Sequence, residues 1–551
     1  MSLEPFYPLY SDSFFKEKQT NNSVIKKSFI VKKPLYFWAS QPIALPLPRF
    51  STSVQGRRGH DVTTHYHMKK IIITAVAGLL SAGVAMAEGY QINSLSTKQI
   101  GMGHTGVALK LGAENMYFNP AGMAYMDKTL DLTGSFTGIM PTATATVDGK
   151  DYETDNGVST PISVNAAFSI YPNLKGGISF YTPYGSSINW TDNWPGSVLS
   201  QNVSLKVFTI QPTLAWAIND KFSIGAGLMV TWGNVDLNKG LVTPSTTDKA
   251  ITALKELGQL PEATPDFGST TPASVNLNGT SEIAVGFNVG AMYNINEQWT
   301  VGASYRSKMG MKVKAGNAHV KYANAIAQGI LGESLDLINE ANFSAEMPCP
   351  WVLSLGASYK PVDRLTLALD ARLTGWKAYK TLDIEFLSEQ LTGYNQYITK
   401  NYKNSWCFSL GAEYALTPRM DLRLGLMVDT SPVDDNYYNP ETPGMTKIEP
   451  TIGFSFRPIP SLSIDLGFMY VAGLGINGAS CEYADLLGKM MPAKLTPAIT
   501  GALIQNGIPA ETAAAMAQAK VASYGFEPTG KFTADYKLHA FIPSIGISYS
   551  F

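Results

Sequence analysis

The sequence predicts an all-β fold, a transmembrane antiparallel β-barrel of about 14 strands with an N-terminal plug inside its lumen. Three observations predict this class. A secretory signal precedes the mature chain, apolar residues alternate with small or polar ones, and short turns alternate with long loops. The composition of the 551 residues agrees, because only 15% are charged while 11% are aromatic and 49 are glycine.

The signal is the segment "MKKIIITAVAGLLSAGVAMA", residues 68–87. It has the basic start, apolar core and small-x-small end of a secretory signal peptide. The core is too short for a membrane helix, and no Cys follows the cut to carry a lipid anchor. Residues 1–67 precede a signal that is normally read at the N-terminus, so we expect translation to start at Met68. A disordered extension is the alternative.

The strand signal is an alternation of period two. It is clear in "WVLSLGASY" from Trp351, in "RLTLALDARLT" from Arg364 and in "MDLRLGLMV" from Met420. Each places apolar residues on one face and small or charged residues on the other, as a strand requires. About fourteen such segments occur. They begin near Thr129, Pro161, Lys175, Leu205, Lys221, Ser281, Gln298, Asn342, Asp363, Asn404, Arg419, Thr446, Ser461 and Lys537.

The connections decide between a soluble sandwich and a membrane barrel. Short turns are expected at 172–175, 219–221, 296–298, 361–364, 417–419 and 458–461, and the longest irregular stretches at 238–280 and 475–530. Loops sorted in this way, with an even strand number, are typical of outer-membrane barrels. Lipid offers no partner to a strand edge, so the last strand should pair with the first. The chain ends on Phe551, which resembles the terminal signal read by the barrel-assembly machinery.

Other functional classes find little support. Lys plus Arg (42) nearly equals Asp plus Glu (43), so nothing indicates a nucleic-acid partner. Cys349, Cys407 and Cys481 are too far apart for a metal motif, and their odd number gives no disulfide framework. The mature chain has only three histidines, none near a GxSxG-type serine, so an enzyme is not expected. We expect no cofactor and no metal.

Residues 88–126 resemble the N-terminal plug of the FadL/TodX family of outer-membrane transporters for hydrophobic compounds. The matching elements are the start Gly89-Tyr90-Gln91, the Gly-rich "GMGHTG" and the triplet Asn119-Pro120-Ala121. The later motifs "YTPYG", "NDKFSIGAGL", "GASYRS" and "TGWKAY" follow in the family's order, so the resemblance covers most of the mature chain. It implies a plug over 88–128 and a barrel over 129–551.

The resemblance also implies a function. The chain is expected to be a monomer in the outer membrane of a Gram-negative cell, in contact with outer-membrane lipid. It would carry long-chain fatty acids or other hydrophobic compounds passively. Extracellular loops would capture the ligand, the lumen would bind it, and movement of the plug and a lateral opening in the wall would release it. A general porin and a structural or adhesive surface protein are the alternatives.

The plug has a physical reason, because a barrel of about fourteen strands leaves a lumen wide enough to leak. Within it, Pro120 removes a backbone donor and pushes Asn119 out of helical geometry. The Asn119 side chain can bond its own downstream backbone. We therefore expect a turn of defined shape. It is either an ordinary turn before the first strand or a part of the plug that contacts the wall.

Basic residues gather on the strand "TVGASYRSKMGMKVK". If Val301, Ala303 and Tyr305 face lipid, the lumen side holds Arg306, Lys308, Lys312 and Lys314. A fatty-acid carboxylate in the lumen needs a cation, so Arg306 and Lys308 are candidate ligand-binding residues. Pairing with acidic residues of the wall is the alternative. The same alternation places Arg372 and Trp376 inside, as further candidate ligand-binding residues, and packing or wall pairing is their alternative role.

A candidate wall opening lies in "YTPYGSSINW", where Pro183 and Gly185 interrupt a strand. Proline inside a strand is normally confined to edges or bulges. In the family, a kink in the third strand makes a lateral opening for the ligand, and this is the third predicted segment. The alternative is a strand that ends at its loop.

A candidate entry groove lies in the loop 247–260, where Ile251, Leu254 and Leu257 are spaced three apart. This spacing predicts a short amphipathic helix, and Gly258 suits its C-terminal end. In the family such helices frame a hydrophobic entry groove. Packing of the loop on itself would give the same pattern.

Overall fold

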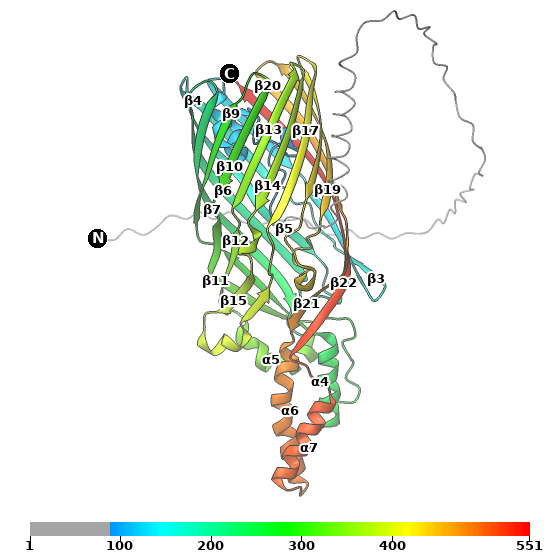
Figure 1. Ribbon diagram of the computed structural model, residues 1–551. Helices are drawn as coiled ribbons and strands as arrows, with labels where there is room; N and C mark the ends of the chain where they lie inside the picture. The colour runs from blue at the N-terminus through cyan, green and yellow to red at the C-terminus, as the bar shows by residue number, and fades with distance from the viewer. Residues whose placement is uncertain (1–88) are drawn as a thin grey trace, which may run out of the picture. The chain divides into compact units, whose positions relative to one another are not determined.

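Fourteen antiparallel strands form a closed barrel in the computed structural model, which describes residues 89–551 (Figure 1). The predicted signal peptide at 68–87 and residues 1–67 lie outside this range. In ring order the wall strands are β1 (Leu130–Thr137), β4 (Ile162–Tyr171), β5 (Leu174–Asn189), β6 (Asn202–Ala217), β7 (Phe222–Gly240), β9 (Ala284–Asn294), β10 (Trp299–Arg306), β13 (Val352–Val362), β14 (Leu365–Thr374), β17 (Ser405–Thr417), β18 (Met420–Asp429), β19 (Lys447–Ile459), β20 (Leu462–Gly473) and β22 (Thr529–Ser550).

The last strand closes the ring as predicted. β22 pairs with β1 from Asp131↔Ser550 to Thr137↔Ser544, and the backbone N–H of Leu130 donates to the carbonyl of Phe551 at 3.0 Å. All six predicted short turns are found, and they lie at the end of the barrel where the C-terminus lies (Figure 1).

One predicted wall strand was wrong. The segment that begins at Asn342 is divided in two by Pro350 and Trp351. Its first part, β12 (Asn342–Cys349), pairs with β11 (Met309–Tyr322) beyond the wall, and only the second part, β13, belongs to the wall. Pro350 cannot donate to a strand ladder, and this accounts for the break.

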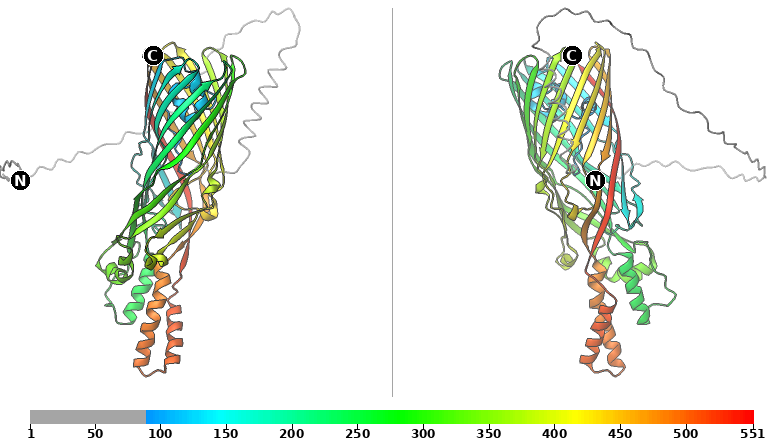
Figure 2. Two further views of the ribbon diagram at one scale, coloured as in Figure 1. Left: turned by 90° about the vertical axis from the view of Figure 1, so that its left-hand side faces the viewer. Right: turned by 45° about the vertical axis from the view of Figure 1, so that its right-hand side comes forward.

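The barrel continues past the wall on the loop side (Figures 1 and 2). The strands of this extension are β2 (Met140–Val147), β3 (Lys150–Glu153), β8 (Ala273–Thr280), β11, β12, β15 (Thr381–Phe386), β16 (Gln396–Thr399) and β21 (Ile476–Ala484). Its helices are α4 (Pro244–Glu256), α5 (Ala325–Leu335), α6 (Leu486–Gln505) and α7 (Ala510–Ser523), with short 3-10 turns η3 (Asp336–Ile338), η4 (Trp376–Ala378), η5 (Glu389–Tyr394) and η6 (Asp435–Tyr437). The two long loops therefore contain regular structure. Among residues 89–551, no helix is both long and apolar enough to cross a membrane.

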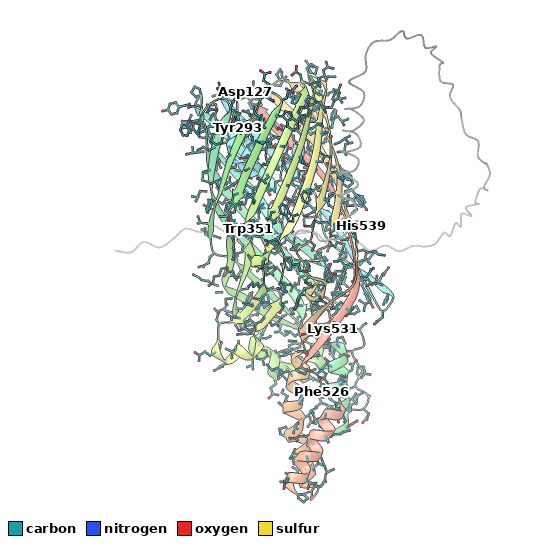
Figure 3. The ribbon with its side chains drawn as sticks, in the orientation of Figure 1. Asp127, Tyr293, Trp351, Phe526, Lys531 and His539 are labelled. Atoms are coloured by element: carbon teal, nitrogen blue, oxygen red, sulfur yellow. The ribbon has the colours of Figure 1, made fainter. Side chains whose placement is uncertain are left out.

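The outer surface of the wall is apolar and its inner surface is polar. Leu355, Leu369 and Leu424 are 52%, 55% and 54% exposed, whereas Asp370 and Arg423 beside them are buried. This inversion is what a barrel in lipid requires. Figure 3 places Tyr293 near the turns and Trp351 about midway along the molecule. Aromatic pairs that are exposed or partly exposed occur at both levels, as in the girdles of outer-membrane barrels.

Residues 89–126, which we call the inner segment, pack against the inner face of the wall. They contain α2 (Thr97–Ile100), η1 (Gly112–Glu114), α3 (Asn115–Phe118) and η2 (Pro120–Tyr125). Most residues of this segment are buried, although its helices are at most six residues long. Such short helices are unstable alone, so their packing against the wall holds them.

Candidate functional site

The Asn-Pro-Ala turn has the defined shape that the sequence predicts. Asn119 is extended (φ −157°, ψ 104°), and its Oδ1 accepts a hydrogen bond from the N–H of Ala121 at 3.1 Å, which caps η2. Its Nδ2 donates to the carbonyls of Val107 at 2.7 Å and of Ala291 at 3.1 Å. Asn119 is fully buried. One side chain therefore shapes the turn and joins two parts of the inner segment to strand β9.

Glycines on the wall allow the inner segment to approach closely. A Cβ on Gly290 would lie 2.0 Å from Asn119 Oδ1, and one on Gly225 would lie 2.4 Å from the carbonyl carbon of Pro120. Glycines with this property occur all around the barrel: a Cβ added to any of them would lie within 3.0 Å of an atom of the inner segment. These positions are Gly177, Gly225, Gly290, Gly302, Gly356, Gly411, Gly425, Gly453, Gly467 and Gly546.

Arg306 contacts the inner segment directly. Its guanidinium donates to the Tyr117 carbonyl at 2.9 Å and lies 4.2 Å from the centre of the Tyr117 ring. Arg306, Arg372, His104 and Asp370 line one cavity, which we call the polar cavity. Both arginines thus lie inside, as predicted. Binding of a ligand carboxylate by Arg306 stays a prediction.

The lysines that follow Arg306 do not lie inside, and this corrects the sequence interpretation. β10 ends at Arg306, and β11 begins at Met309 with the opposite faces inward. Lys308, Lys312 and Lys314 are therefore exposed, and Lys314 pairs with Glu282 at 2.5 Å. The break between the strands shifts the alternation by one residue, which the continuous pattern did not reveal.

Trp376 packs over the start of the inner segment. It is completely buried, and its ring lies 4.8 Å from the ring of Tyr90 in an edge-on arrangement. A Cβ on Gly89 would lie 3.0 Å from the Trp376 ring. The Tyr90 hydroxyl donates to the carbonyl of Pro348 at 2.5 Å. The first two described residues are thus held by β12 and η4, which adjoin the neighbouring wall strands β13 and β14.

Strand β5 carries a bulge at the predicted place. Tyr181 pairs with Thr209 of β6 but Tyr184 pairs with Val207, so Thr182 and Pro183 together face one residue. The strand continues to Asn189, which excludes the alternative of a strand end at this motif.

The other edge of β5 leaves its neighbour β4 at the bulge. The last pair between them is Ser163↔Tyr181. Beyond it, the inner segment takes the place of a wall strand. Ile92 donates its N–H to the carbonyl of Pro183, Gly185 donates its N–H to that of Tyr90, and both distances are 2.9 Å.

A series of three cavities leads from this edge to the loops. The wall cavity, about 550 Å³, lies at the β5 bulge between Ile92, Pro161 and Gly185. The apolar cavity shares Ser186, Leu205 and Thr442 with it. The outer cavity, about 660 Å³, lies between the loops and shares Leu277 and Ile384 with the apolar cavity. No residue is shared with the polar cavity of Arg306.

The predicted loop helix is present, but its apolar face lines none of these cavities. α4 begins after the cap Thr243, ends at Glu256, and is followed by Gly258 with a φ of +66°. Ile251 is fully buried in the core of the extension on the loop side, and Leu254 and Leu257 pack against that core. The three side chains therefore hold the loop together, and an entry groove formed by them is not supported.

The sequence analysis missed a buried ion pair on the apolar cavity. Lys400 Nζ bonds to Glu441 Oε2, and the two side chains are only 1% and 5% exposed. They come from two irregular segments 41 residues apart, so no periodic pattern joins them. Among residues 89–551, no group of His, Cys, Asp and Glu could hold a metal ion, and the three cysteines are buried and form no disulfide.

Comparison with known proteins gives the family. The sequence model of the family described as outer membrane protein transport protein (OMPP1/FadL/TodX) matches residues 78–486.

This chain belongs to the OMPP1/FadL/TodX family.

The FadL/TodX membership places the chain in the outer membrane and among transporters of hydrophobic compounds, not enzymes. It is 24% identical to outer membrane protein P1 of Haemophilus influenzae over 432 residues, 74% of this chain and 90% of that protein. It is 22% identical to the long-chain fatty acid transport protein of Escherichia coli O6:H1, over 74% of this chain and 92% of that protein.

Solved structures of FadL/TodX proteins share the fold. A Pseudomonas aeruginosa FadL homologue matches with a TM-score of 0.64 and 18% identity, covering 84% of this chain and all of that one. The Ralstonia pickettii toluene transporter TbuX matches with a TM-score of 0.55 and 16% identity, covering 83% of this chain and 99% of that one. Identities this low establish the barrel alone.

Proposed function

We propose that this chain carries hydrophobic compounds passively from the loops to an opening in the barrel wall. The ligand enters the outer cavity, passes through the apolar cavity and leaves at the β5 bulge. The observation that carries this proposal is the series of three cavities that share lining residues and end where β5 has no partner in the wall. Neither nucleotide nor ion coupling is needed, because the ligand moves from water into lipid.

The inner segment acts as a plug in this proposal. Its contacts with glycines around the wall favour a segment that stays in place and blocks the lumen. Its start, Gly89 to Ser94, lies on the path, and Tyr90 and Ile92 cover the free edge of β5 there. Release of this short stretch is enough to open the wall. Arg306 and Asn119 anchor the remainder of the plug.

The proposed substrates are hydrophobic compounds as a broad class. Relatives include proteins named for long-chain fatty acids and for toluene. The apolar cavity, lined mostly by Leu, Val, Ile and Met, suits any hydrocarbon portion.

Blocking the apolar cavity tests the proposal. Leu205 lines both the apolar and the wall cavity, so Leu205→Trp should abolish uptake of a hydrophobic probe such as toluene by whole cells. Leu424→Trp, on the lipid face, is the matched control and should transport normally. Equal uptake by both variants would refute the path. Steady ion conductance of the wild-type protein in planar bilayers would favour a general porin instead.

A further inference from the structure

The apolar cavity contains one buried polar atom with no partner. Glu441 bonds to Lys400 through Oε2, but its Oε1 has no hydrogen-bond partner among the described residues. The Glu441 side chain is only 5% exposed. An unsatisfied buried acceptor costs free energy, and in native proteins it commonly marks the place of a missing partner.

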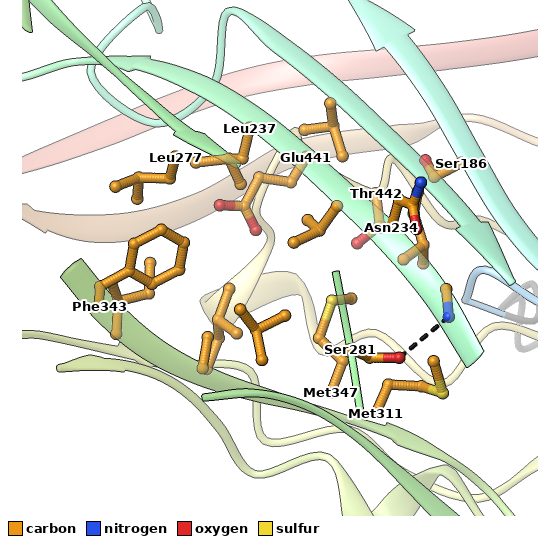
Figure 4. Close-up of a pocket in the computed structure, with 18 of the residues that line it drawn as sticks. Ser186, Asn234, Leu237, Leu277, Ser281, Met311, Phe343, Met347, Glu441 and Thr442 are labelled. Carbon is orange, nitrogen blue, oxygen red and sulfur yellow. Dashed lines mark hydrogen bonds between the residues drawn. The ribbon is translucent and has the colours of Figure 1, made fainter. Parts of the chain in front are cut away.

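The surroundings of Glu441 are largely apolar, and two of the polar residues there already bond elsewhere. Figure 4 shows its carboxylate among apolar side chains of the cavity, including Leu237, Leu277 and Phe343. Of the other polar residues there, Thr442 already bonds to the hydroxyl of Tyr402 at 2.8 Å, and Ser281 donates to the carbonyl of Glu282 at 3.0 Å. Glu441 Oε1 is thus an acceptor directed into a hydrocarbon environment.

The charge of the pair limits what can bind there. Lys400 and Glu441 together carry no net charge, and the ammonium already contacts Oε2. The nearby buried ammonium of Lys239 is bonded to Gln396 Oε1 at 2.8 Å. A ligand carboxylate would bring a second acceptor and a second negative charge beside the Glu441 carboxylate, at a high desolvation cost. A ligand cation would meet the ammonium of Lys400. A neutral group that donates one hydrogen bond meets neither penalty.

We infer that the apolar cavity selects neutral hydrophobic molecules that carry a hydroxyl group, alcohols or phenols, with the hydroxyl donating to Glu441 Oε1. This inference rests on the proposed function and names the ligand class of its central cavity. Lys400 is a positioning residue, because it holds the carboxylate through the other oxygen.

The test compares three probes that share one hydrocarbon part. They are 4-butylphenol, which has a donor, 4-butylanisole, in which a methyl group replaces that hydrogen, and 4-butylbenzoate, which is anionic. Binding to the protein in lipid nanodiscs is measured by equilibrium dialysis against empty nanodiscs. Hydrogen bonds to charged groups are strong, so the phenol should bind on the order of 10-fold more tightly than the anisole. The benzoate should bind most weakly.

A double variant identifies the residue responsible. Lys400→Met with Glu441→Leu removes both charges of the pair together and keeps the volume, so neither partner is left as an unpaired buried charge. It should bind the anisole as the wild type does but lose the preference for the phenol. The matched control is Lys520→Met with Glu256→Leu, which removes an exposed Lys–Glu pair of 2.6 Å between α7 and α4. It should keep the preference.

The outcomes separate this inference from the proposed function. Equal binding of phenol and anisole by the wild type, or tightest binding of the benzoate, would overturn the inference while leaving hydrophobic transport intact. A phenol preference that survives in the Lys400→Met, Glu441→Leu variant would also overturn it. Failure of all three probes to bind would remove the proposed function as well.

Discussion

The guanidinium of Arg306 on strand β10 both donates a hydrogen bond to the Tyr117 carbonyl at 2.9 Å and lies over the Tyr117 ring at 4.2 Å. The wall and the inner segment are therefore joined by the side chain of Arg306. Asn288 supports the same site, because its Nδ2 donates to the carbonyl of Met116 at 3.0 Å. These contacts hold the short helix α3 against the wall.

Replacing Arg306 should loosen the inner segment without unfolding the barrel. Arg306→Met loses the hydrogen bond and the cation–π contact, at a cost of about 2 kcal/mol in local stability. Hydrogen exchange measured by mass spectrometry should rise about 30-fold over residues 115–125, since 1.4 kcal/mol is tenfold, and stay unchanged in the wall strands. Lys312→Met, which removes an exposed cation, is the control. Unchanged exchange would show that Arg306 does not anchor the segment.

A methyl group on the inner wall should displace the plug. Gly290→Ala would place a Cβ 2.0 Å from Asn119 Oδ1, and overpacking of this kind costs about 1–3 kcal/mol. We expect the variant to conduct ions in planar bilayers, because the turn at Asn119 must move away from the wall. Gly134→Ala on β1, where the nearest atom would be 3.8 Å away, should remain closed. A closed Gly290→Ala barrel would argue that the wall yields instead of the plug.

The wall was predictable from sequence because lipid on one face and a polar interior on the other impose period two on every strand. That rule placed Arg306, Arg372 and Trp376 inside. It failed where the pairing changes, as at Lys308, since a one-residue break reverses both faces. The rule could not predict the role of Glu441, because irregular segments have no period and a buried ion pair is formed by tertiary contacts alone.

The inner segment should be sensitive to pH through Glu114. Burial raises the pKa of its carboxyl to about 7, an effect that Lys98 opposes and Asp465 reinforces. The unfolded value is about 4.3, so the folded segment binds the proton more tightly. This contribution to stability is complete below about pH 4 and is lost as the pH rises to about 7. Glu114→Gln should remove this dependence, which hydrogen exchange of residues 95–115 between pH 4 and 8 will measure. An identical pH profile in both proteins would contradict it.

Tethering the start of the inner segment should close the path. Gln91 and Tyr184 form an isolated antiparallel bridge at the β5 bulge, so cysteines at these two positions lie within reach of a disulfide. In a background with the three native cysteines replaced by alanine, the oxidised Gln91→Cys, Tyr184→Cys variant should lose uptake of a hydrophobic probe, and reduction should restore it. The physical reason is that β5 has no wall partner beyond Tyr181, so residues 90–92 cover its edge next to the bulge, where the ligand leaves.

The control tether must join strands that are not expected to move. Leu369 and Leu410 are direct partners on β14 and β17 and face lipid, so cysteines there should form a disulfide without any effect on uptake. Full uptake by the oxidised Gln91→Cys, Tyr184→Cys variant would show that residues 90–92 need not separate from β5. The exit would then lie elsewhere. The next place to search is the polar cavity between Arg306 and Asp370, which the inner segment and the wall enclose together away from the bulge.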